Sequence, residues 1–161
     1  KRGGLDHEAE RVFLLSLTYG AETHALAAVK EVIQIYKREP VIDGMWRAGT
    51  RLEQGIRQSI DEHHLGEYFK VVGKPCALVY ATLDVEKKSS QFFRTLFLQE
   101  TIKRGILAPS FVVSYCHMDA DIDRTVEAVH EALHVYRRAL NEGVEKYLIG
   151  RSVKPVFRRY A

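Results

Sequence analysis

The apolar pattern between Asp119 and Gly143 constrains the fold more than any other feature of the chain. Apolar side chains recur there at spacings that alternate between four and three residues, which is the period of one helix face: Ile122, Val126, Val129, Leu133, Tyr136 and Leu140. Asp119 or Asp121 can cap the start of this helix, and Gly143 is expected to end it. A helix with a single apolar face needs other elements to cover it, so the pattern predicts a packed globular domain.

Three β-prone segments precede this helix. Residues 68–72 and 76–83 are rich in strand-forming side chains and are separated by Gly73-Lys74-Pro75, which is typical of a turn. Residues 106–115 form the third such segment. Cys76 and Cys116 are expected in buried strands, where a free thiol behaves as a small apolar side chain. These segments together predict a small three-stranded sheet.

Two helices are expected ahead of the first strand. Residues 22–38 carry apolar side chains at helical spacing (Leu26, Val29, Ile33 and Tyr36), and Pro40 ends the pattern. Residues 41–63 form the second helix, although three glycines lower its intrinsic stability by roughly 1 kcal/mol each relative to alanine: Gly44, Gly49 and Gly55. We therefore expect this second helix to depend on packing.

A further helix is predicted over residues 91–104, with Ser89 or Ser90 as its cap and Gly105 at its end. Its inward face is expected to carry Phe92, Phe93, Leu96, Phe97 and Ile102. The order is helix, helix, strand, strand, helix, strand, helix. The predicted class is α/β in the broad sense, an α+β domain whose small sheet carries helices on one face and is preceded by two helices.

Composition excludes some classes of function. The chain has 161 residues and a net charge of +3, and its charges are mixed except for a basic end formed by Arg151, Lys154, Arg158 and Arg159. No run approaches the ~18 apolar residues that a membrane span requires, and the signatures of nucleic-acid modules are missing. We expect a cytoplasmic protein that binds neither nucleic acid nor a membrane.

The segment Leu14–Ala28 is a junction at which an apolar run breaks into a short polar turn and continues as a helix. The turn offers the Thr18 hydroxyl and backbone N–H groups at a helix start, where the helix dipole favours negative charge. Phosphate is the obvious anion, and simple capping of the helix is the alternative interpretation.

Two parts of the sequence are similar to one enzyme family. The run Thr18–Ala28 resembles a segment of class III pyridoxal-phosphate-dependent aminotransferases. The run Arg104–Ser110, with His117 and Asp121–Thr125 after it, resembles the closing domain of glutamate-1-semialdehyde aminomutase and its relatives. The resemblance extends in the same order from about Val12 to Leu140.

The resemblance implies a fold type I enzyme that works as a homodimer with pyridoxal 5′-phosphate and a small amino-acid or amine substrate. Thr18 would bind the cofactor phosphate across the dimer. Residues 1–40 would belong to the large domain and dimer interface, 41–66 to a connecting helix, and 67–161 to the C-terminal small domain.

The catalytic groups are expected outside this chain. The Schiff-base lysine of the family belongs to a preceding large domain, so the resemblance implies no catalytic residue here. It also implies that the piece alone is inactive and holds no cofactor. His117 is expected to make only a cap or turn hydrogen bond. Ser114 stands where relatives that clamp a substrate carboxylate carry an arginine, which favours the aminomutase.

Two other functions stay open at this point. His130-Glu131-Ala132-Leu133-His134 fits the His-Glu-x-x-His pattern of zinc hydrolases. A third ligand is missing from that pattern, because Glu142 and Glu145 point poorly back toward the two histidines. The other alternative is a non-enzymatic α/β interaction domain that uses its basic end and an apolar helix face.

Overall fold

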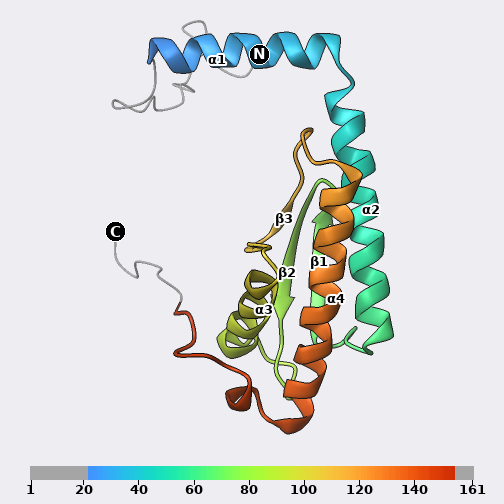
Figure 1. The fold of residues 1–161 in the computed structure, drawn as a ribbon, viewed down its shortest axis with the longest axis vertical. Helices are drawn as coiled ribbons and strands as arrows, with labels where there is room; N and C mark the ends of the chain where they lie inside the picture. The colour runs from blue at the N-terminus through green and yellow to red at the C-terminus, as the bar shows by residue number, and fades with distance from the viewer. Residues whose placement is uncertain (1–21, 155–161) are drawn as a thin grey trace, which may run out of the picture. The chain divides into compact units, whose positions relative to one another are not determined.

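This computed structural model describes residues 22–154, which divide between two compact units, residues 1–40 and 41–161 (Figure 1). The described part of the first unit is helix α1 (Thr23–Arg38). Its expected apolar stripe is present, and each of its large members is about half exposed: Leu26, Val29, Ile33 and Tyr36. No residue of α1 is buried.

The second unit contains a three-stranded antiparallel sheet in the order β1-β2-β3, and this confirms the predicted fold class. Its elements follow one another along the chain as α2 (Val41–Glu62), β1 (Phe69–Lys74), β2 (Ala77–Thr82), α3 (Gln91–Lys103), β3 (Phe111–Val112), α4 (Asp119–Glu142) and a short 3₁₀ turn (Val144–Lys146). Among the described helices, none combines the length and apolar character that crossing a membrane requires.

The sheet buries one face against the helices. Phe69 pairs with Thr82 and Lys74 with Ala77, which leaves Pro75 and Cys76 as a two-residue turn. Side chains alternate between buried and exposed along β1 and β2. The exposed face still carries apolar residues, with one valine from each strand: Val72, Val79 and Val112.

Aromatic rings fill the core between the sheet and the helices. The ring centroid of Phe69 lies 4.8 Å from that of Phe97 and 5.2 Å from that of Tyr80, and Phe93 lies 4.6 Å from Tyr136. The Tyr136 hydroxyl donates to the Leu83 carbonyl oxygen at 2.6 Å. Burial raises the pKa of Tyr136 above its ordinary value, so this hydroxyl stays protonated as a donor.

Helix α2 packs closely because of its glycines. A Cβ atom on Gly55 would lie 2.6 Å from the Val126 side chain on α4, and one on Gly44 would lie 2.8 Å from the Tyr115 ring. A Cβ atom on Gly49 would collide with the backbone of the β1–β2 turn. The same glycines that weaken α2 as an isolated helix therefore allow it to lie close to the rest of the domain. This agrees with the expectation that α2 depends on packing.

Several local predictions are wrong. The third strand was predicted over residues 106–115, but β3 covers only Phe111–Val112. Pro109, just before it, has no N–H to donate to a neighbouring strand. On α3, Phe92 and Ile102 were expected to face inward, but they are 47% and 53% exposed. They lie off the buried helix face, which is formed by Phe93, Leu96, Phe97, Glu100 and Thr101.

The expected thiol positions and one helix cap also need correction. Cys76 lies in the hairpin turn and is half-buried, and Cys116 is exposed, so neither is in a buried strand. Ser90 caps α3 by accepting the Phe93 N–H. At α4 the N-cap residue is Met118 rather than Asp119, and Asp121 acts from within the first turn by accepting the Met118 N–H at 2.9 Å.

Candidate functional site: a cavity assembled from the resembling segments

The loop between α3 and β3 is held in one conformation by hydrogen bonds to its backbone. The Tyr80 hydroxyl donates to the Ala108 carbonyl oxygen at 2.7 Å, and the Arg94 guanidinium donates to the Pro109 carbonyl oxygen at 3.0 Å. Burial raises the pKa of Tyr80 to about 12, so its hydroxyl remains a donor. The loop therefore forms a fixed wall.

Gly105 lets the chain turn at the start of this loop. Its φ is +78°, which a residue with a side chain rarely adopts, and a Cβ atom there would lie 2.9 Å from an Arg124 guanidinium nitrogen on α4. The glycine thus brings the loop against the first turns of α4.

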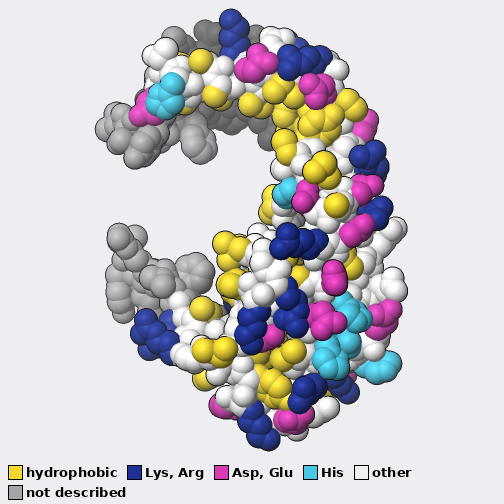
Figure 2. Space-filling view, in the orientation of Figure 1, with side chains coloured by type: hydrophobic (Ala, Val, Ile, Leu, Met, Phe, Trp, Pro, Cys, Tyr) yellow, Lys and Arg dark blue, Asp and Glu magenta, His cyan; other side chains and the backbone are white. Residues whose placement is uncertain are grey.

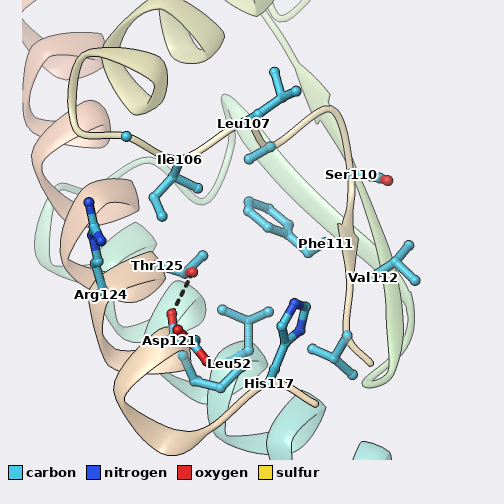
Figure 3. A pocket seen from close by; sticks show the side chains of 14 residues that line it. Leu52, Ile106, Leu107, Ser110, Phe111, Val112, His117, Asp121, Arg124 and Thr125 are labelled. Atoms are coloured by element: carbon cyan, nitrogen blue, oxygen red, sulfur yellow. Dashed lines mark hydrogen bonds between the residues drawn. The ribbon is translucent and has the colours of Figure 1, made fainter. Parts of the chain in front are cut away.

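The turn before α4 lies opposite this loop, and the two form the walls of a cavity. The backbone N–H of Ser114 donates to Nδ1 of His117 at 3.1 Å, which confirms the turn hydrogen bond expected of this histidine. The Thr125 hydroxyl donates to the Asp121 carbonyl oxygen at 2.7 Å (Figure 3). These bonds orient His117 and Thr125 along one side of the cavity.

Between the two walls lies a cavity of about 350 Å³. Figure 3 shows Ile106 of the α3–β3 loop pointing across it toward Thr125 of α4, whereas the Leu107 side chain points away. Leu52 of α2 contributes to its lining as well. A volume of this size is within the usual range for small-molecule sites, ~300–1,000 Å³.

The cavity offers binding groups rather than a catalytic pair. Arg124 has no acidic group within ion-pair distance among the described residues, and Thr125 lines the same space, whereas the Ser110 hydroxyl points away from it (Figure 3). His117 uses Nδ1 as an acceptor for the Ser114 N–H, so that nitrogen is not free to act as a base. The arrangement can hold and orient a polar ligand, and it fits one wall of a larger site.

Thr18, the residue expected to bind a cofactor phosphate, lies outside the described residues. The structure therefore gives no position for it relative to this cavity.

The two histidines of the zinc pattern lie on α4, away from the cavity. The Glu131 carboxylate lies 3.7 Å from the Arg104 guanidinium. Within residues 22–154, no group of three or more His, Cys, Asp and Glu side chains is arranged to hold a metal ion. Sequence reasoning missed that His63, from the end of α2, packs beside both histidines, with ring centroids 4.5 Å from His130 and 5.6 Å from His134.

No protein-family model matches this chain. It is 33% identical over 95 residues to a glutamate-1-semialdehyde 2,1-aminomutase of Akkermansia muciniphila, a match that covers 53% of the chain and 22% of that protein. It is 25% identical over 138 residues to gamma aminobutyrate transaminase 2 of Solanum lycopersicum, which covers 81% of the chain and 29% of that protein.

A solved structure shares the fold. The FumI protein of Sphingopyxis sp. MTA144, in its PLP internal aldimine form, superposes with a TM-score of 0.66 at 19% identity, over 82% of this chain and 31% of that one. The chain thus spans less than a third of the length of each of these relatives. These findings support the resemblance read from the sequence: the chain is similar to the C-terminal region of the class III pyridoxal-phosphate-dependent aminotransferases.

Proposed function

We propose that this chain is the C-terminal region of a class III pyridoxal-phosphate-dependent enzyme that transfers or shifts an amino group, of the glutamate-1-semialdehyde aminomutase kind. One observation carries the proposal. The two segments that resemble this family, residues 104–110 and 121–125, are separate in sequence but supply facing walls of one cavity. A chance likeness of two short segments gives no reason for them to meet in space.

The cofactor and its reactive lysine would come largely from the part of the relatives that this chain does not cover. Pyridoxal phosphate, when bound, serves as an electron sink for the substrate carbon. The residues of this chain would position it: Thr18 would bind the phosphate of the cofactor held mainly by the other subunit of a homodimer. No lysine lines the described cavity, which suits a supporting wall.

The substrate is proposed to be a small amino acid or amine, and the enzyme to be cytoplasmic. By the resemblance, Ser114 stands where relatives that clamp a substrate carboxylate carry an arginine, and its backbone N–H donates to Nδ1 of His117. That absence of a clamp favours the aminomutase over an aminotransferase that holds an α-carboxylate.

A substrate comparison on the natural full-length protein tests the proposal. With pyridoxal phosphate present, we expect turnover of glutamate-1-semialdehyde to exceed transamination of γ-aminobutyrate, and the 161-residue chain alone to catalyse neither. Turnover of neither substrate by the full-length protein, with no spectral change on adding amines, would contradict the amino-transfer proposal. Faster γ-aminobutyrate transamination would overturn only the aminomutase assignment.

A further inference from the structure

A groove lies between the start of α3 and the end of α4. It has a volume of about 260 Å³ and is lined by the first residues of α3, the loop before them, the end of α4 and the 3₁₀ turn that follows. Two large apolar side chains of this lining are exposed, Val85 by 60% and Phe92 by 47%. The groove is separate from the cavity described above, because the two share no lining residue.

The charged side chains that line this groove are acidic. They are Asp84, Glu86 and Glu145, and its lining includes no Lys or Arg. Glu86 forms an exposed ion pair with Lys88 at 2.6 Å, whereas Glu145 has no basic group within ion-pair distance among the described residues. Figure 2 shows exposed hydrophobic side chains with acidic ones near them at the end of this unit where α4 and the 3₁₀ turn lie. The groove therefore suits a ligand that is both apolar and cationic.

The segment after the 3₁₀ turn is fastened along one side of α3. The Gln99 side chain donates to the Tyr147 carbonyl oxygen at 2.8 Å and accepts the Ile149 N–H at 2.7 Å. One turn nearer the start of α3, the Thr95 hydroxyl oxygen accepts the Val153 N–H at 2.9 Å. The segment thus passes along α3 toward the start of that helix (Figure 1).

Phe92, in the groove, is the next position along that path. Phe92, Thr95 and Gln99 are separated by three and four residues, so they share one side of α3. Phe92 lies only about 4.5 Å before Thr95 along the helix axis. Since each residue of an extended chain covers up to ~3.6 Å, the third and fourth residues after Val153 are within reach of the Phe92 ring.

The sequence beyond this point has the chemistry that suits the groove. Residues 155–161 lie outside the described residues and read Pro-Val-Phe-Arg-Arg-Tyr-Ala. Val156 and Phe157 are the third and fourth residues after Val153, and two arginines follow them. Apolar side chains next to two guanidinium groups complement the exposed apolar side chains and the carboxylates of the groove.

We propose that residues 155–161 of the same chain occupy this groove, with the Phe157 ring against Phe92 and Val85. The two arginines that follow Phe157 would lie near Glu145. Docking would continue the path that the hydrogen bonds to Gln99 and Thr95 begin, and it would join the start of α3 to the end of α4. Nothing in this inference depends on the proposed amino-transfer function.

Nuclear Overhauser contacts measured on the tag-free 161-residue chain test the docking directly. We expect contacts between the Phe157 ring protons and the Val85 methyl groups, and these contacts should persist when the protein is diluted. Phe92→Ala should abolish them, because it removes the ring against which Phe157 packs. The matched control is Ile102→Ala, a similarly exposed apolar side chain on α3 that does not line the groove. Ile102→Ala should leave the contacts intact.

Three results would overturn the docking. They are the absence of contacts between Phe157 and Val85, contacts that survive in Phe92→Ala, or contacts that vanish on dilution, which would assign the groove to a second copy of the chain. Urea unfolding shows whether each variant is folded. If Phe92→Ala does not fold, Phe157→Ala decides the matter. It should shift the amide resonances of Val85 and Phe92, and unchanged resonances would contradict the proposal.

Discussion

Arg51 on α2 holds Asp123 on α4 through two parallel hydrogen bonds, from Nε to Oδ1 at 2.9 Å and from Nη2 to Oδ2 at 2.8 Å. Asp119 adds a third oxygen, 3.6 Å from Nη1 of Arg51. The pair joins α2 to α4, but all of these side chains are half exposed or more.

Arg51→Ala should lower the free energy of unfolding only slightly, because exposed ion pairs are screened by water and salt. The loss should shrink further at about 1 M NaCl, where the screening length is ~3 Å. Urea unfolding of the variant and the parent chain at low and high salt measures both effects. A large loss that is the same at both salt concentrations would show that Arg51 acts through packing instead.

Gly49→Ala should be far more damaging than the loss of that ion pair. The new methyl group would collide with the Pro75 carbonyl, which is backbone and cannot move aside. Overpacking of this kind costs about 1–3 kcal/mol. Gly66→Ala is the matched control, since a Cβ atom there meets nothing within 4 Å. Equal unfolding midpoints in urea for the two variants would refute the close approach of α2 to the hairpin.

Tyr136→Phe should destabilise the core while keeping its shape. The hydroxyl donates to the Leu83 carbonyl at 2.6 Å and also lies 3.2 Å from the Tyr68 carbonyl. Removing it leaves buried acceptors unsatisfied, at a cost of about 1–3 kcal/mol. Tyr36→Phe on the exposed face of α1 serves as the control and should change the thermal midpoint little. If the two substitutions lower the midpoint equally, the hydrogen bond contributes nothing measurable.

His63 should make the domain sensitive to mild acid. The unfolded chain takes up a proton on this histidine near pH 6.5, and the folded chain does so only at lower pH, because burial and the two neighbouring histidines disfavour the charge. This contribution to stability is complete above about pH 6.5 and declines as the pH falls below it. The free energy of unfolding, measured in EDTA, should therefore drop between about pH 7.5 and about pH 5.5. His63→Gln should flatten that drop, and an unchanged slope in the variant would assign the acid sensitivity to other groups.

The regular elements could be predicted from the sequence because their signals are local. The spacing of Val129, Leu133 and Tyr136 defines the buried face of α4 without any knowledge of its neighbours. Ser90 before a run of helix formers likewise marks the start of α3. The prediction of a strand over residues 106–115 was wrong because it considered strand propensity alone. It ignored that Pro109 has no N–H to donate to a neighbouring strand.

The sites depend on contacts between segments that are distant in the sequence, and here local reasoning could not succeed. The resemblance identified the segments around Gly105 and Arg124, but only the fold shows that they face each other across a cavity. The search for a third metal ligand looked only at the residues after His134, whereas the structure packs His63, just after the end of α2, beside the two histidines without forming a metal-binding group among the described residues. A pair of adjacent histidines just after an amphipathic helix was the one available signal.

The central claim is that this chain helps to hold pyridoxal phosphate, and cofactor retention by the natural full-length protein tests it most directly. We predict that the purified protein releases a stoichiometric amount of pyridoxal phosphate in acid. Thr18→Ala should raise the dissociation constant for the cofactor by about 10-fold to 100-fold, the loss of one charge-assisted hydrogen bond. A full-length protein that binds no pyridoxal phosphate even when it is supplied in excess would contradict the account.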